Sequence, residues 1–171
     1  MEFLKQKNMK IRLATEKDFN EIWRIFQSVI AGGDTYVNDE NTTKDEACAK
    51  WMSKSAKTFV AEINDKIVGA YLLRSNQVGR GSHVANASYI VDANTRGAGV
   101  GKALALHSIS SAKAAGYRAM QFNFVASTNV GAVRLWSKLG FHTVGRLPGA
   151  FNHPSKGYVD ALVMFKWLAS E

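Results

Sequence analysis

The sequence predicts a single α/β domain in which strands and helices alternate along the chain. Its 171 residues suffice for one domain with a full hydrophobic core and are few for two. Strand-like and helix-like apolar patterns alternate along residues 9–171, without an internal repeat or a low-complexity linker. At residues 89–104 an apolar run passes through three glycines at alternate positions into a helical pattern. The polar residues 1–8 are predicted to form a flexible N-terminus.

The first half of the chain is predicted to form two helices and three strands. The patterns indicate a strand at 10–14, a helix that starts at Thr15 and is stopped by residues 31–34, a second helix from about 43 to 54, and strands at 58–63 and 66–73. Thr15 and Asp18 have the spacing of a helix cap, and apolar residues then recur at helical spacing. Asn64 and Asp65 favour the turn of a β-hairpin.

The second half continues the alternation. It is predicted to contain a loop at 74–82, a strand at 84–91, a helix at 99–115, a strand at 119–125, a helix at 129–139, a strand at 141–146, a loop at 147–154 and a strand at 158–167. Gly116 and Gly140 follow the two helices and favour their ends, because glycine readily adopts the left-handed conformation of a helix C-terminus.

The glycine-rich turn is a candidate anion-binding site. The first turn of a helix leaves N–H groups unpaired, the helix dipole favours negative charge there, and glycine lets the backbone approach phosphate oxygens. A P-loop would have glycine in place of Arg96 and Ser or Thr in place of Ala103. A dinucleotide-binding loop would have the spacing G-x-G-x-x-G and an acidic residue on the next strand. Here the spacing is G-x-G-x-G and no acid lies between Asp92 and Asp160, so both nucleotide motifs are excluded.

Two motifs resemble those of one enzyme family. The sequence Arg96-x-x-Gly99-x-Gly101 resembles the pyrophosphate-binding loop of the GCN5-related N-acetyltransferases, the acetyl-CoA-dependent GNAT family. The stretch from Asn129 to Phe141 is similar to the second signature of that family, in which an Asn, an Ala and an aromatic residue lead into a K-x-G-F helix end. The resemblance starts at Met9 and is strongest over residues 82–141. It implies a mixed, mostly antiparallel sheet of about seven strands with about four helices on its two faces, and two central strands that diverge to admit acetyl-CoA.

The resemblance implies two groups of residues that bind acetyl-CoA. Main-chain N–H groups would hold the pyrophosphate at Arg96, Gly97, Gly99, Val100, Gly101 and Lys102. The pantetheine arm would pair with the main chain of Ile90 and Val91 and contact Asn129, Ala132, Leu135 and Lys138. Asn is also a favoured helix N-cap, so capping stays open as the role of Asn129.

Acetyl transfer also needs a neutral amine, a polarised carbonyl and a stabilised thiolate. At the position of Trp136 the family commonly has a tyrosine. The hydroxyl of that tyrosine can protonate the departing thiolate. An indole N–H can donate a hydrogen bond but lacks comparable acidity, and packing is the alternative role of Trp136. The strand at 84–91 lacks the glutamate that often serves as the base. Fallback candidates are His83, His153, Asp34 and Asp160.

A narrower resemblance concerns the acceptor. Asn86, Tyr89 and Asn123 are similar to residues of fungal acetyltransferases that act on proline analogues such as azetidine-2-carboxylate. In those enzymes asparagines and an aromatic residue contact the small amino acid, which makes these three residues candidates for binding substrate and the two asparagines candidates for catalysis. Alternatively, the side-chain amide of Asn123 forms its hydrogen bonds with the backbone and does not contact the substrate. Tyr36 lies between the first two helices, in a region that forms a wall of the acceptor site in the family.

Together these features predict an enzyme that transfers the acetyl group directly to the amine of a small amino-acid-like acceptor in a ternary complex. Two alternatives stay open. A protein or peptide N-acetyltransferase would need an open groove for its acceptor. A non-catalytic acetyl-CoA-binding module would account for the missing glutamate and tyrosine.

The formal net charge of +8 is unevenly distributed. The stretch without acids holds Arg96, Lys102, Lys113, Arg118, Arg134, Lys138, Arg146 and Lys156. This positive field suits an anionic cosubstrate with several phosphates. No RNA-binding aromatic motif and no zinc-ligand spacing accompany it, so neither a nucleic-acid partner nor a metal is predicted.

Cys48 is the only cysteine, which rules out an intrachain disulfide and favours a reducing compartment. The first residues contain no apolar run of signal-peptide length, and nowhere do eighteen apolar residues follow one another. We therefore expect a cytoplasmic protein without a membrane partner. Dimers are common among similar proteins, so a homodimer stays open.

Overall fold

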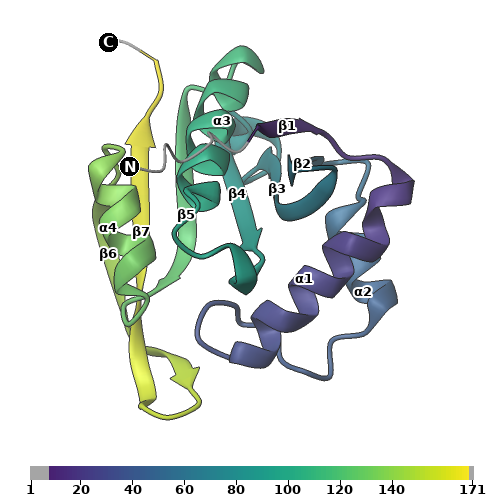
Figure 1. Ribbon diagram of the computed structural model, residues 1–171. Coiled ribbons are helices and arrows are strands. Elements are labelled where there is room, and N and C mark those ends of the chain that lie inside the picture. The colour runs from purple at the N-terminus through teal and green to yellow at the C-terminus, as the bar shows by residue number, and fades with distance from the viewer. Residues whose placement is uncertain (1–7, 170–171) are drawn as a thin grey trace, which may run out of the picture.

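The computed structural model describes residues 8–169, so the predicted flexible N-terminus lies outside the described residues except for Asn8. Along the chain the elements are β1 (Met9–Leu13), α1 (Phe19–Gly32), α2 (Lys44–Trp51), β2 (Lys57–Ile63), β3 (Lys66–Ser75), β4 (Val84–Val91), α3 (Val100–Ala114), β5 (Ala119–Ala126), α4 (Val130–Lys138), β6 (His142–His153) and β7 (Gly157–Trp167), as labelled in Figure 1. Short 3₁₀ turns lie at Glu16–Asp18, Gly79–Gly81 and Ala93–Thr95.

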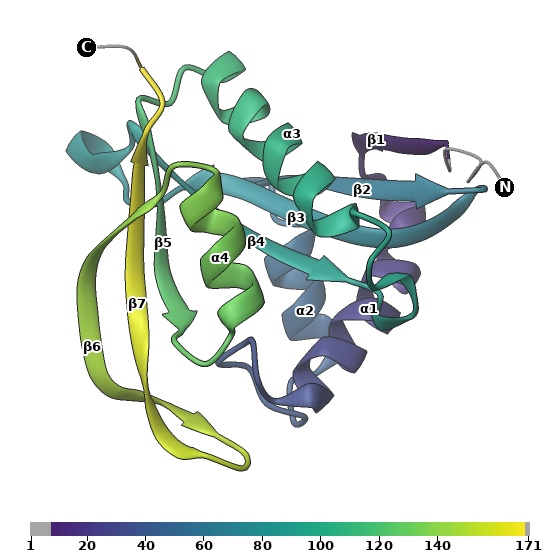
Figure 2. The ribbon, with the colours of Figure 1, turned by 60° about the vertical axis from the view of Figure 1, so that its left-hand side comes forward.

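The strands form one seven-stranded sheet with the order β1-β2-β3-β4-β5-β7-β6. Every neighbouring pair is antiparallel except β4 and β5, which confirms the predicted mixed, mostly antiparallel sheet. The parallel pair is short, because only Val84 and Ala85 of β4 find partners on β5. Beyond these residues the two strands run apart, as Figure 2 shows, and the centre of the sheet is open at this point.

Helices cover both faces of the sheet, as expected. On one face Phe26 of α1 and Trp51 of α2 pack against Leu72 of β3. On the other face, which Figure 2 views, Leu104 of α3 and Trp136 of α4 pack with residues of the central strands. Successive residues of a strand point to opposite faces, so each central strand contributes to both cores.

The segment 147–154 corrects a prediction, because it is not a loop. Residues 142–153 form one long strand, β6, which pairs with β7 almost to the tip of the hairpin, and both strands reach beyond the rest of the sheet in Figure 2. Pro148 and Gly149 lie where the register shifts between Leu147 and Phe151. A bulge in an edge strand tolerates the missing N–H of proline, and the N–H of Gly149 donates to the Asp160 carboxylate at 3.0 Å.

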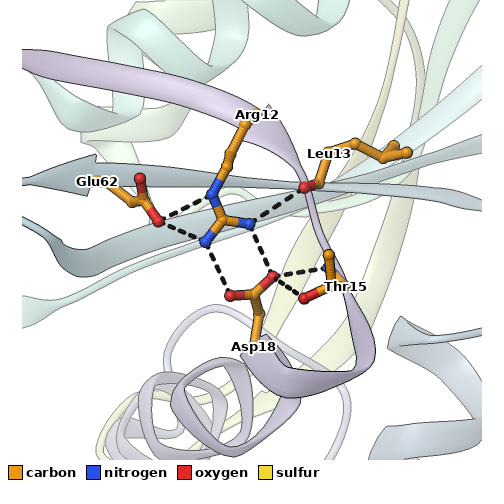
Figure 3. Close-up of polar contacts among 5 residues, drawn as sticks. All are labelled: Arg12, Leu13, Thr15, Asp18 and Glu62. Atoms are coloured by element: carbon orange, nitrogen blue, oxygen red, sulfur yellow. Dashed lines mark hydrogen bonds and ion pairs between the residues drawn. The ribbon is translucent and has the colours of Figure 1, made fainter.

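Arg12 joins β1 to two other parts of the fold (Figure 3). Its guanidinium donates to both carboxylate oxygens of Asp18, at 2.8 and 2.9 Å, and to Glu62 of β2 at 2.9 Å. Asp18 also accepts from the N–H and hydroxyl of Thr15, the predicted cap. The hydrogen bonds from Arg12 hold the pKa of Asp18 well below its usual range. This network fixes the start of α1 against the sheet edge.

Candidate active site

The divergence of β4 and β5 opens a cavity of about 600 Å³. Its lining combines β4 and β5 with the end of α1, the segment that follows α1, the start of the glycine-rich turn and α4. The predicted site residues that line it are Tyr36, Asn86, Tyr89, Ile90, Val91, Arg96, Asn123, Asn129, Ala132 and Trp136. Residues from distant parts of the sequence thus meet at one opening in the sheet.

Tyr36 connects the segment after α1 to β4. Its hydroxyl donates a hydrogen bond to the main-chain carbonyl of Tyr89 at 2.9 Å. Its ring meets Phe26 edge-on at a centroid distance of 5.3 Å, and the ammonium of Lys50 lies 4.7 Å from the centroid of the Tyr36 ring. Burial raises the pKa of Tyr36, so its hydroxyl stays protonated and serves as a donor.

The two candidate asparagines lie on facing strands, and both amides have partners. Asn86 donates from Nδ2 to the carbonyl of Gln121 at 2.9 Å, and so bridges β4 and β5 just beyond their last paired residues. Asn123 is exposed in the bulge of β5 between Phe122 and Val125. It accepts from Gln121 Nε2 at 2.8 Å and donates to Asn76 Oδ1 at 2.7 Å.

The predicted aromatic residues pack tightly beside the cavity. Trp136 is 7% exposed, with its ring centroid 4.4 Å from that of Phe122 and 4.9 Å from that of Tyr89. The Tyr89 hydroxyl is hydrogen-bonded to Ser108 of α3 at 2.6 Å, on the face opposite Asn86. Packing is therefore an observed role of Trp136, and the Tyr89 hydroxyl already has a partner.

The glycine-rich turn presents unpaired main-chain donors. Gly97 and Gly99 have φ values of 80° and 77°, which glycine adopts without the strain of a side chain, and Gly99 is the N-cap of α3. Within residues 8–169, the N–H groups of residues 99–102 donate to no acceptor. Arg96 lines the adjoining end of the cavity and Lys102 is exposed. Donors and positive charge of this kind fit a pyrophosphate.

Other predicted cofactor residues are not part of the cavity lining: Gly97, Gly99, Val100, Gly101, Lys102, Leu135 and Lys138. Val100 is buried in the core, so only its main chain can take part in binding. Asn129 caps α4, since its Oδ1 accepts from the N–H of Ala132 at 3.2 Å, while its Nδ2 has no acceptor within residues 8–169. Capping therefore leaves a donor for a ligand.

Among the four fallback bases, Asp34 alone lines the cavity. Asp160 is held by Arg146 at 2.7 Å and by Gly149, which is a structural role within the β6–β7 hairpin. His83 and His153 contact nearby atoms of their own turns. The second carboxylate in the lining, Asp92, pairs with Arg24 of α1 at 2.9 Å.

Six polar lining residues are missing from the sequence-based set: Ser28, Thr35, Lys50, Arg74, Ser88 and Asp92. Lys50 stands three residues after Ala47 and one before Trp51, and this spacing indicates the inner side of α2. Arg74 carries no such signal, because only the pairing of β3 with β4 places it opposite Asn86.

Comparison with known proteins agrees with this arrangement. Residues 16–141 match the model of the Acetyltransferase (GNAT) family. A solved GCN5-related N-acetyltransferase from Kribbella flavida is 40% identical, with a TM-score of 0.89 over 93% of this chain and 97% of that one. N-acetyltransferase aca1 from Schizosaccharomyces pombe is 29% identical over 77% of this chain and 71% of its own length. A Bacillus subtilis protein, "Putative phosphinothricin acetyltransferase YwnH", is 28% identical over 88% and 94%.

The chain therefore belongs to the GNAT family, as predicted, and is an N-acetyltransferase. Acetyl-CoA is the cosubstrate of the family, and solved proteins of this fold hold it. Within residues 8–169, no group of three or more His, Cys, Asp or Glu side chains could hold a metal ion. No helix in the same range has the length and apolar character needed to cross a bilayer.

Proposed function

We propose that this enzyme acetylates the amine of a small amino-acid-like acceptor, such as a proline analogue, by direct transfer in a ternary complex. The observation that carries the proposal is the cavity of about 600 Å³ between β4 and β5, which Tyr36 and its neighbours wall on one side. A space of this size suits a small molecule. The name of the Bacillus subtilis relative, "Putative phosphinothricin acetyltransferase YwnH", refers to a small amino acid as acceptor.

Acetyl-CoA supplies the activated acetyl thioester. Arg96 and the N–H groups of residues 99–102 would bind its pyrophosphate, helped by the positive end of the α3 dipole. The main chain of Ile90 and Val91 lies where β4 has no partner on β5, and would hydrogen-bond the pantetheine arm. Nδ2 of Asn129 would donate to the same arm while its Oδ1 continues to cap α4.

The acceptor would lie between the asparagines and the Tyr36 segment. Asn86 keeps Oδ1 to accept from the amine, because only its Nδ2 is engaged. Asn123 would exchange its contact with Asn76 for one with the acceptor. Asp34 would take the amine proton through an ordered water, and the indole N–H of Trp136 would donate to the departing sulfur.

Among residues 8–169, the absence of cysteine and histidine from the cavity lining supports direct transfer. Cys48, the only cysteine, lies outside the cavity lining, and so do the four histidines. An acyl-enzyme route needs an activated nucleophile beside the thioester. The amine itself would therefore attack the thioester carbonyl.

The proposal extends to the setting of the enzyme. A single cysteine favours a reducing compartment, and we place the protein in the cytoplasm. A homodimer is the proposed assembly, which sedimentation would test directly.

Thiol release from acetyl-CoA, measured with a disulfide dye, tests the reaction. The amine panel holds azetidine-2-carboxylate, proline analogues, common amino acids, polyamines and short peptides. Release with the cyclic imino acids alone supports the proposal. Release only with peptides would favour a peptide N-acetyltransferase, and binding of acetyl-CoA without release on any amine would favour a non-catalytic module.

A further inference from the structure

Two cationic side chains from different elements face the same side of the cavity. Lys50 comes from α2, and its ammonium lies above the rings of Tyr36, at 4.7 Å, and Phe26, at 5.4 Å. Arg74 comes from the end of β3, directly opposite Asn86 of β4. Both residues line the cavity. Because Arg74 and Leu72 point the same way along β3, Arg74 lies on the face that α1 and α2 cover.

Neither cation has an anionic partner in the part of the chain that the structure describes. Within residues 8–169, no ion pair involves Lys50 or Arg74, and the polar contact of Lys50 is a long one of 3.4 Å to Asn38 Oδ1. Of the two carboxylates in the lining, Asp92 pairs with Arg24, and Asp34 accepts from the Thr35 hydroxyl and forms no ion pair with either cation within residues 8–169. The cavity therefore carries two positive charges on one wall that the protein itself does not neutralise.

Such an arrangement is unfavourable without a ligand. Removal from water, together with the positive charge of Arg74, lowers the pKa of Lys50 to about 8. At neutral pH the ammonium is still mostly protonated, so the protein carries a partly buried charge beside a like charge. Charged side chains that destabilise the folded protein in this way are typical of ligand sites, where the ligand supplies the missing counter-charge.

We propose that Lys50 and Arg74 together bind the carboxylate of the acceptor, so that the enzyme selects amino or imino acids over simple amines. This inference rests on the proposed function and narrows its substrate class. Arg74 pairs across the strands with Asn86, the residue proposed to orient the amine. Lys50 lies above the ring of Tyr36, and the Tyr36 hydroxyl donates to the main chain of β4 in the region where β4 and β5 diverge. A carboxylate held by both cations would leave the α-amine directed toward the opening in the sheet. A guanidinium offers two parallel donors to a carboxylate, and an ammonium adds a third.

Matched acceptors with and without the negative charge test the inference. Thiol release is measured for azetidine-2-carboxylate and for its carboxamide, with the wild-type enzyme, Lys50→Met and Arg74→Gln. Each substitution is expected to lower kcat/KM for the carboxylate about 10- to 100-fold, mostly through KM, since a charge-assisted hydrogen bond is lost. The rate with the carboxamide is expected to change little, so the preference for the carboxylate falls. Lys50→Arg, which keeps the charge, is expected to retain most of that preference.

Two exposed cations outside the lining serve as controls. Lys44 begins the same helix and contacts Asn20, and Arg80 lies in the 3₁₀ turn after β3. Lys44→Met and Arg80→Gln are expected to leave the preference for the carboxylate unchanged. If these variants lose as much of the preference for the carboxylate as Lys50→Met and Arg74→Gln do, the effect is one of general surface charge. That result would overturn the assignment of Lys50 and Arg74 as the carboxylate site.

The outcomes separate this inference from the proposed function. Thiol release at equal rates from the carboxylate and the carboxamide would overturn the inference and leave the acetyltransferase proposal standing. If no amine gives thiol release, the proposed function fails, and calorimetric titration of the protein–CoA complex with azetidine-2-carboxylate decides the inference independently. Heat of binding that disappears in Lys50→Met supports the carboxylate site, and no heat with the wild-type protein overturns it.

Discussion

Asn86 Nδ2 donates a hydrogen bond to the main-chain carbonyl of Gln121 at 2.9 Å, just beyond the last residue pair that joins β4 to β5. A side chain thus replaces the ladder hydrogen bond where the two strands begin to diverge. Asn86 lines the cavity, and within residues 8–169 its Oδ1 accepts no hydrogen bond. Asn86 therefore has both a structural partner and a position suited to the acceptor.

Asn86→Ala is expected to lower kcat/KM for the acceptor about 10-fold or more and to reduce the free energy of unfolding by about 1 kcal/mol, the usual net value of one hydrogen bond. Thiol-release kinetics and urea unfolding measure the two effects. Asn41→Ala, on the exposed segment before α2, is the matched control and is expected to change neither. An unfolding free energy that drops with unchanged kinetics would assign Asn86 a purely structural role.

Gly99→Ala tests the glycine-rich turn. Its φ of 77° strains any residue with a Cβ, so we expect a loss of about 1 kcal/mol in stability and weaker binding of acetyl-CoA, because the N–H groups at the start of α3 would move. Calorimetric titration with CoA measures the affinity. Gly131→Ala in the first turn of α4 is the control, since that position is exposed and does not have a positive φ. Unchanged affinity for CoA in Gly99→Ala would argue against this turn as the pyrophosphate site.

The network in Figure 3 predicts how stability depends on acid. Because Arg12 lowers the pKa of Asp18 in the folded protein, Asp18 stabilises the fold above its unfolded pKa of 3.8, and this contribution is lost as the pH falls below that value. Asp18→Asn is therefore expected to cost about 1–3 kcal/mol at neutral pH and much less in strong acid. Urea unfolding across this pH range measures the difference, with the exposed Glu16→Gln as control. A cost that does not change with pH would contradict the ion-pair explanation.

Lys50→Met is expected to stabilise the protein while impairing its use of the acceptor. The pKa of Lys50 is about 8 in the folded protein against 10.5 for the free side chain, so the unfolded state binds the proton more tightly. Below the folded pKa the charge destabilises the fold, and this penalty disappears as the pH rises toward the unfolded value. We expect Lys50→Met to gain about 1–3 kcal/mol near neutral pH and little in alkali, as measured by urea unfolding. A loss of stability at neutral pH would contradict the description of Lys50 as an uncompensated charge.

The elements of the fold could be predicted from the sequence because they depend on local patterns. Strand alternation, the Thr15–Asp18 cap and the Asn64-Asp65 turn each involve residues a few positions apart, and each predicted element is present. The helix predicted at 99–115 is likewise present as α3, with Gly99 as its N-cap. The segment 147–154 was predicted wrongly, since Pro and Gly favour loops locally, and only the pairing with β7 makes an edge strand of them.

The tertiary structure alone decided which residues accompany Asn86 in the cavity lining. Arg74 and Asn86 become neighbours through the register of β3 and β4, and Lys50 joins them because α2 packs on the same face of the sheet. No local pattern encodes these distances, which depend on long-range strand pairing and on how the helices cover the sheet. The class of enzyme and its cosubstrate could be predicted from the sequence by itself, because two local motifs, Arg96-x-x-Gly99-x-Gly101 and the stretch from Asn129 to Phe141, resemble those of the GNAT family. The pair of cations in the cavity lining required the fold, because Lys50 and Arg74 come from separate elements, α2 and β3.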